Sequence, residues 1–193
     1  ELRNVTFGYS GTFTASPRGL VPAVTTAGSV GDDPTDSFVP GGPGTVAFPV
    51  TIPAGTTHAR FSLFNANVTP PSDLDLYVYR NNAGSPILVG ASGGGTSAEE
   101  VNLLNPVADT YTVYVHGFAV AGTANFTLFQ WLLGTAAAGN MTANAPAAAV
   151  QGTAGTINLT FSGLAAGTKY MGSVAYDGIA GLPNPTIVRI DTP

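Results

Sequence analysis

The 193-residue sequence contains no cysteine, which excludes both a disulfide scaffold and a thiolate metal site. Charge is also scarce: charged residues make up 9% of the chain, where about a quarter is usual, and Lys169 is the only lysine. With a net charge of −5, the chain lacks the basic surface that would attract nucleic acids or anionic membranes. Its apolar runs are only a few residues long, so we expect no membrane-spanning helix.

What remains is a chain able to form a packed core beneath an uncharged polar surface. Hydrophobic residues make up 44% of the sequence, which argues against disorder. The remainder is rich in Gly, Thr, Ser and Asn, a composition typical of exported bacterial proteins. No signal-peptide pattern opens the sequence, so we expect Glu1 to begin an excised fragment or a mature product.

Two alternating patterns, residues 73–79 and 111–116, organise the sequence. Apolar and polar side chains alternate in both, as in strands with one buried face. The side chains predicted to point inward are Leu74, Leu76, Val78, Tyr111, Val113 and Val115. Those predicted to point outward are Asp73, Asp75, Tyr77, Tyr79, Thr112, Tyr114 and His116.

Short strand patterns recur between residues 45 and 132, with turn signals about every ten residues and no helical periodicity. The candidate strands are 45–52, 58–65, 74–80, 86–90, 97–104, 110–118 and 124–132. This spacing predicts an all-β fold, an antiparallel β-sandwich of jelly-roll-like type.

The two ends of the chain differ from this middle part in their strand patterns, which Pro/Gly-rich and linker-like stretches interrupt. Residues 1–29 contain short strand patterns and a Pro/Gly break at 17–22, which predict leader strands or a tether. A linker-like stretch begins at Gly134, and strands are predicted again at 155–161, 169–176 and 185–191. We therefore predict a leader (1–29), a sandwich (30–133) and a smaller β-sandwich (134–193).

Three segments resemble the bacterial pre-peptidase C-terminal domain, over roughly residues 30–132. They are Pro-Ala-Gly-Thr-Thr-His-Ala-Arg-Phe at 53–61, Ser-Asp-Leu-Asp-Leu-Tyr-Val-Tyr-Arg at 72–80, and Ala-Asp-Thr-Tyr-Thr-Val-Tyr-Val-His-Gly at 108–117. Asp109 stands where the last motif often has Gly. The tail, at 163–170 and 186–190, is similar to the fibronectin-III-like units that end many secreted subtilisin-like serine peptidases, which implies that the smaller sandwich is Ig/fibronectin-like.

The resemblance implies a secreted, non-catalytic C-terminal accessory region of such a peptidase. Its implied partners are the catalytic domain of the parent enzyme and a proteinaceous substrate. The sequence also resembles bacterial collagen-binding modules, which share the sandwich and often bind calcium. A rival interpretation is a secretion or folding extension that stabilises the protease and is trimmed after export.

The sequence predicts no catalytic residue in this region. Gly90-Ala-Ser-Gly-Gly94 matches the letters of a nucleophile elbow, but that motif needs a helix after Ser92 and a glycine run follows instead. Only His58 and His116 could serve as its base, and both lie within predicted strands. We expect a non-catalytic fragment of a serine peptidase.

Five aspartates are candidate metal ligands: Asp32, Asp33, Asp36, Asp73 and Asp75. Calcium takes six to eight oxygen ligands, and clustered carboxylates supply them. The alternative is a solvated Gly/Asp/Pro turn. Two isolated histidines without cysteine leave a zinc site short of ligands.

Tyr77, Tyr79, Tyr114 and His116 form a candidate substrate-binding face, because aromatic side chains with polar tips are enriched where proteins bind partners. The alternative is that these rings are buried beneath the second unit or beneath a loop.

Overall fold

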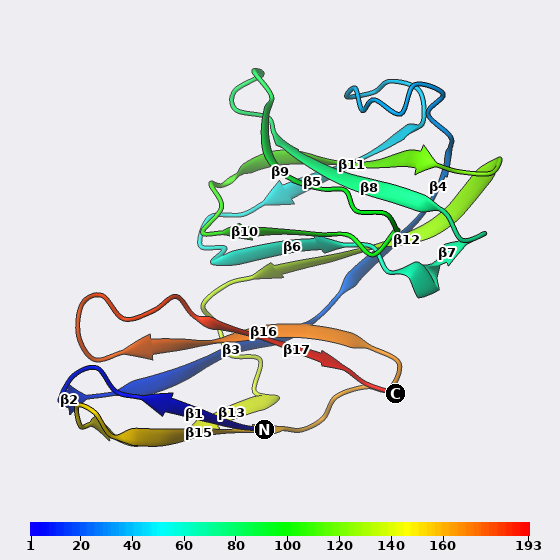
Figure 1. Cartoon of the computed structure of the whole chain (residues 1–193). Helices are drawn as coiled ribbons and strands as arrows, with labels where there is room; N and C mark the ends of the chain where they lie inside the picture. Colours follow the sequence, from blue (N-terminus) through cyan, green and yellow to red (C-terminus); the bar gives the residue numbers. More distant parts are fainter. The chain divides into compact units, whose positions relative to one another are not determined.

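A computed structural model describes residues 1–193 and is all-β, with 57% of residues in strands (Figure 1). Its one helical segment is the short 3-10 turn η1 (Asn65–Asn67), and no helix is long and apolar enough to cross a bilayer. Several antiparallel sheets build the molecule. The predicted fold class is confirmed.

Contacts within the chain define two units. The central unit is Val24–Leu132, and the terminal unit combines Glu1–Ala23 with Leu133–Pro193. The structure thus differs from the predicted division into leader, sandwich and tail. Most of the predicted leader belongs to the same unit as the tail, because strands before residue 23 pair with strands after residue 147.

The central unit contains two sheets. The first has the order β5 (Thr45–Ile52), β11 (Asp109–Ala119), β8 (Asp73–Arg80) and β9 (Ile87–Ser92). The second has the order β10 (Glu100–Leu104), β6 (His58–Ser62), β12 (Thr123–Leu133) and β4 (Val24–Gly31), with β7 (Val68–Thr69) also pairing with β12.

The central core contains the side chains that alternation predicts to point inward. Those of β8 and β11 belong to one buried cluster with Phe61 of β6 and Phe126 of β12. Five of them are fully buried: Leu74, Leu76, Val78, Val113 and Val115. Burying each contributes about 1.5–3 kcal/mol, so the two motif strands are fixed with their other side chains on the opposite face.

The terminal unit contains two larger sheets, each of three strands. One has the order β1 (Leu2–Thr6), β15 (Ala154–Phe161) and β13 (Met141–Asn144). The other has the order β17 (Thr186–Asp191), β16 (Lys169–Asp177) and β3 (Thr14–Pro22). The short strands β2 (Gly11–Thr12) and β14 (Ala148–Ala149) pair with each other, and both sheets contribute to one core.

The Pro/Gly segment 17–22 lies within β3, although the sequence predicts a break there. The pairing survives because β3 is the last strand of its sheet, and edge strands tolerate proline. Gly19 has a φ of 75°, which glycine adopts without a steric penalty, and the register with β16 shifts beside it. Its N–H and carbonyl bond to Ala136 and Ala138 instead.

Candidate functional site

The outward face of sheet β5-β11-β8-β9 gathers the predicted binding residues. In the antiparallel register of β8 and β11, Tyr114 lies opposite Tyr77, and His116 lies opposite Asp75. Tyr79 is two residues further along β8, on the same face, with its ring centroid 5.8 Å from that of Tyr114. Directly opposed residues in such a pair have Cβ atoms about 5 Å apart, so the four predicted side chains form one patch.

The loop 32–44 is fastened to this sheet at both of its ends by the backbone of Gly117. The Asp33 N–H donates to the Gly117 carbonyl at 2.9 Å, and the Gly117 N–H donates to the Gly44 carbonyl at 2.9 Å. A Cβ at Gly117 would lie 2.2 Å from the Gly31 carbonyl oxygen, so only glycine fits this close approach. Asp32 adds a further anchor by accepting from the Val120 N–H at 2.6 Å.

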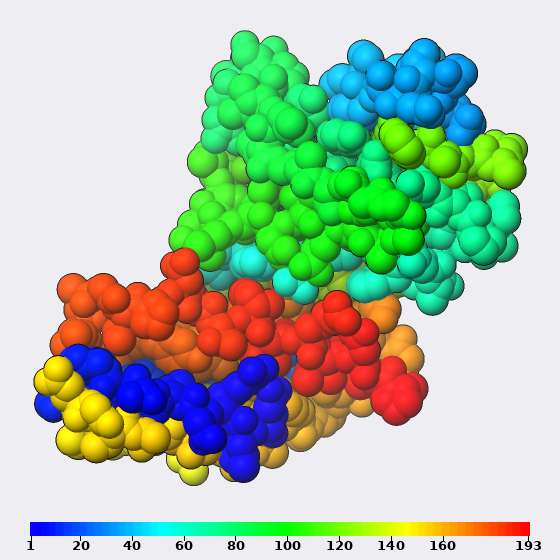
Figure 2. All heavy atoms as spheres, in the orientation of Figure 1, coloured from blue at the N-terminus to red at the C-terminus, as the bar shows by residue number.

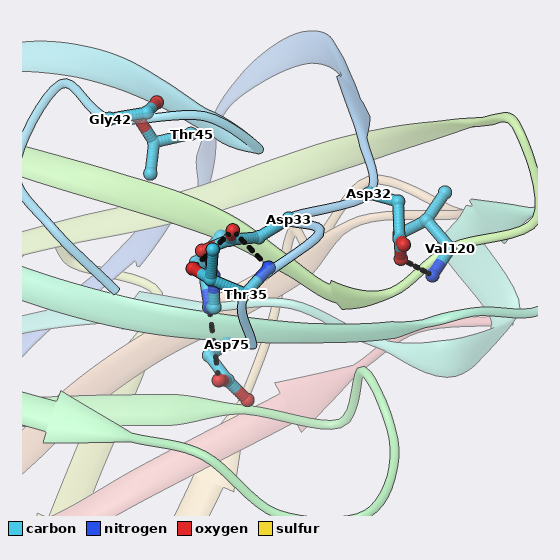
Figure 3. A network of polar contacts seen from close by, with 8 residues as sticks. Asp32, Asp33, Thr35, Gly42, Thr45, Asp75 and Val120 are labelled. Atoms are coloured by element: carbon cyan, nitrogen blue, oxygen red, sulfur yellow. Dashed lines mark hydrogen bonds and ion pairs between the residues drawn. The ribbon is translucent and has the colours of Figure 1, made fainter. Parts of the chain in front are cut away.

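His116 ties the same loop to the sheet from inside. Its Nε2 lies 3.0 Å from Asp33 Oδ2 on the loop, and its Nδ1 lies 3.4 Å from Asp75 Oδ2 on β8. The imidazole is 1% exposed, and both carboxylates are buried. Figure 3 shows Asp33 and Thr35 on the loop, with Asp75 below them on its strand. A buried histidine between two carboxylates is a structural tie between loop and sheet.

The two carboxylates have opposite pKa shifts. The pKa of Asp33 is lowered to about 2, chiefly because its carboxylate accepts from the Thr35 N–H, and further because it bonds to His116 and the Thr35 hydroxyl. Burial raises the pKa of Asp75 above its usual range, partly offset by its contact with His116. The hydrogen bonds of Asp33 therefore stabilise its ionised form, whereas burial opposes ionisation of Asp75.

Phe38, carried by the loop, lies against all four rings of the aromatic patch. Its ring stacks on Tyr77 with centroids 3.8 Å apart and planes 5° from parallel. It also meets the rings of Tyr114 and His116 edge-on, at 5.6 and 5.7 Å. The loop thus covers His116, which is buried, and stacks Phe38 on Tyr77, as the sequence left open. The Phe38 ring also lies 6.2 Å from that of Tyr79, and the three tyrosines of the patch are half-buried.

Tyr79 and Tyr114 line a hollow of about 470 Å³ on this face. Three prolines from three different segments share its wall: Pro40, Pro49 and Pro86. Arg80 adds the only cationic side chain of the lining, with its Nε 3.7 Å from Asp109. The combination of tyrosine rings, proline rings and one guanidinium suits an uncharged, partly apolar ligand segment with exposed carbonyl groups.

The five predicted metal ligands do not assemble into one site. Asp33 and Asp75 lie on opposite sides of His116, Asp32 bonds to a backbone N–H, and Asp36 is exposed. No group of three or more His, Cys, Asp or Glu side chains is arranged to hold a metal ion. Asp73 differs from the others, because its Oδ1 is buried without a hydrogen-bond partner. Burial and the nearby Glu99 raise the pKa of Asp73.

Ser92 ends strand β9 and is followed by a loop and then by β10, so the helix of a nucleophile elbow does not follow it. Its hydroxyl donates to Glu99. Neither histidine bonds to Ser92: His58 Nε2 lies 3.0 Å from Asn102 Oδ1, and His116 is held by its two carboxylates.

The sequence patterns did not identify Phe38 or the three prolines that line the hollow, Pro40, Pro49 and Pro86. Phe38 stands alone in a Gly/Pro/Asp-rich loop, and Pro40 belongs to the same loop. Pro49 and Pro86 fall within the predicted strands 45–52 and 86–90, where no pattern marks them as part of a site. The pairing of β5, β11, β8 and β9, together with the loop bonded to Gly117, brings them to one place. A lone aromatic residue between two turn-rich stretches is the one signal that could have indicated Phe38.

A comparison with curated proteins finds Pyrolysin from Pyrococcus furiosus, 34% identical over 107 residues. The match covers 55% of this chain but only 7% of Pyrolysin, which is a subtilisin-like protease. This distant, partial similarity is consistent with the C-terminal region of such a peptidase and suggests an accessory region. No protein-family model matches the chain.

Proposed function

We propose that this chain is a non-catalytic accessory region of a secreted subtilisin-like peptidase, and that its central unit holds proteinaceous substrate for the attached catalytic domain. The observation that carries the proposal is the hollow on the outward sheet face, lined by Tyr79, Tyr114 and three prolines. The partial similarity to Pyrolysin supports the attachment to a protease.

The hollow favours an extended polypeptide over a charged or compact ligand. Aromatic rings and proline rings are the walls on which proline-rich, extended peptides dock. Tyrosine hot spots combine an apolar body with a polar tip that satisfies a backbone group of the ligand. The single guanidinium of Arg80 can donate to a backbone carbonyl without demanding an anionic partner.

Adsorption to insoluble protein polymers tests this function. We expect the intact chain to adsorb to collagen or keratin, and Tyr79→Ala and Tyr114→Ala to lose about 2 kcal/mol of binding, roughly thirtyfold in affinity. Phe118→Ala is the matched control, because Phe118 is an exposed ring on β11 outside the hollow. Its adsorption should equal that of the unaltered chain.

Calcium binding stays a second proposal, supported by one observation: the buried, unpartnered Oδ1 of Asp73. A cation there would satisfy that oxygen and favour the ionised carboxylate. We expect EDTA to lower the melting temperature and added calcium to restore it, because binding to the folded state stabilises it by mass action. Asp73→Asn should abolish this response, and an identical melt with EDTA and with calcium would exclude the ion.

A further inference from the structure

The terminal unit is closed on one side and open on the other. Strands β3 and β13, one from each of its sheets, contact each other and close one side. The opposite end strands, β1 and β17, have no further strand beside them within their sheets. Figure 2 shows the N-terminal residues (blue) and the last strand (red) on one face of this unit.

A hollow of about 470 Å³ lies at this open side. β1 contributes Val5 and Thr6, and β17 contributes Thr186. The rings of Phe7, Tyr9, Phe13 and Tyr176 and the segment 179–183, between β16 and β17, line the rest. No charged side chain lines it. Both phenols of the lining are already hydrogen-bonded, Tyr176 to Thr186 Oγ1 at 2.7 Å and Tyr9 to the Thr12 carbonyl at 2.7 Å, so the hollow offers mainly apolar surface.

The outer edge of β1 presents backbone groups that no strand of this chain uses. Phe7 exchanges hydrogen bonds with the 152–153 turn, and the Glu1 carbonyl accepts from Leu159, so the odd-numbered residues of this segment face β15. Alternation then directs the N–H and C=O groups of Leu2, Asn4 and Thr6 outward. Natural edges are commonly blocked by lysine, proline or a bulge, and β1 has none of these. Its one charged residue, Arg3, is paired with Glu1 at 2.7 Å.

We propose that this open side binds an extended peptide strand, which adds to the outer edge of β1 and places alternate apolar side chains in the hollow. The unpaired backbone edge selects an extended polypeptide, since only such a chain matches a row of alternating donors and acceptors. The uncharged aromatic lining selects aliphatic or aromatic side chains at every second position. This site is separate in sequence and lining from the tyrosine hollow of the central unit.

Fluorescence anisotropy on the full chain tests the site. The probe is a labelled synthetic heptapeptide, Thr-Val-Thr-Phe-Thr-Val-Thr, and a second peptide of the same composition groups its apolar residues together. The alternating peptide should bind, and the grouped peptide should bind at least tenfold more weakly. Equal binding of the two peptides, or binding of neither, would overturn the proposal.

Two variants with matched controls locate the binding. Asn4→Pro removes an outward N–H from the edge strand and should weaken binding at least tenfold, whereas Asn4→Ala keeps that N–H and should not. Both lose the same side-chain bond to Thr156. Ile179→Asp puts a charge into the lining of the hollow and should also weaken peptide binding at least tenfold. Val150→Asp, at a similarly exposed site outside the hollow, should have no effect.

Sedimentation velocity separates the peptide site from self-association. A second copy of this chain could pair edge to edge through β1, and then Asn4→Pro would convert a dimer to a monomer. We expect the unaltered chain and Asn4→Pro to sediment alike in the absence of peptide. A dimer that Asn4→Pro dissociates would show that the occupant is another copy and would overturn the peptide assignment.

Discussion

Asp33 links the loop 32–44 to the sheet through its charge. Its ionised form accepts from Thr35 and contacts His116, and these contacts lower its pKa to about 2. A carboxylate whose pKa is lower in the folded state stabilises the protein above its unfolded value of about 3.8. That stabilisation is lost as the pH falls through the folded value, which sets a window from about pH 4 down to about pH 2.

We therefore expect Asp33→Asn to lower the melting temperature at neutral pH and to remove part of the acid sensitivity. The difference in melting temperature between the unaltered chain and Asp33→Asn should shrink as the pH falls from about 4 to about 2. Melting curves recorded by circular dichroism measure it. Asp36→Asn is the control on the same loop, because Asp36 is exposed and its side chain makes no hydrogen bond in the structure. A constant difference across the window would remove this role of Asp33.

Asp75, which contacts the same histidine, has a pKa shift of the opposite sign. Burial raises its pKa, so ionising it costs stability as the pH rises above its unfolded value. Asp75→Asn should consequently destabilise the chain less at pH 7 than Asp33→Asn does. A larger loss for Asp75→Asn would mean that the 3.4 Å contact with His116 outweighs the burial of the charge.

At the scale of the element, the sequence predicts the two motif strands well and their surroundings poorly. Alternation places Leu76 and Val113 in the core because period two survives whatever the partner strand is. It cannot place Phe38 over Tyr77, since that contact depends on a loop whose path is set by backbone bonds to Gly117. His116 illustrates the same limit: alternation puts it on the outward face, but the loop then buries it.

Gly117 is the point at which strand and loop are joined. Gly117→Ala would place a methyl carbon 2.2 Å from the Gly31 carbonyl oxygen, so the strand or the loop must shift. We expect a loss of about 1–3 kcal/mol in the free energy of unfolding. Amide hydrogen exchange should also accelerate at Asp33, whose N–H bonds to the Gly117 carbonyl. Gly95→Ala, where a Cβ meets no atom within 4 Å, should change neither quantity. Equal effects of the two variants would contradict the role of Gly117 in holding the loop 32–44 to β11.

At the scale of the whole molecule, local patterns indicated most strands but not which unit they build. The short strand patterns before residue 23 have partners that lie about 140–160 residues away in sequence, as Arg3 opposite Ile157 illustrates. Such long-range pairing leaves no local mark in a single sequence. The sequence also gives no strand prediction at 141–149, because β13 has only four residues and β14 only two, both alanines.

This division of the chain predicts how fragments behave. Residues 24–132 carry both sheets of the central unit and should fold alone, with a cooperative melt. Residues 133–193 alone should not fold, because β15 and β16 would lose their partners β1 and β3. Circular dichroism and proton NMR of the two fragments check this. A cooperative melt for 133–193 would favour the simpler division at residue 134.

The most direct measurement of the central claim is an adsorption isotherm recorded beside a melting curve for the same protein samples. The chain, Tyr79→Ala, Tyr114→Ala and Phe118→Ala would be compared on insoluble collagen and keratin, with cellulose and chitin as non-protein surfaces. A substrate-holding accessory region predicts adsorption to a protein polymer that falls about thirtyfold in both tyrosine variants, persists in Phe118→Ala, and is accompanied by nearly unchanged melts. Absent adsorption, equal adsorption by all four proteins, or a collapse of the melt in the tyrosine variants would contradict it.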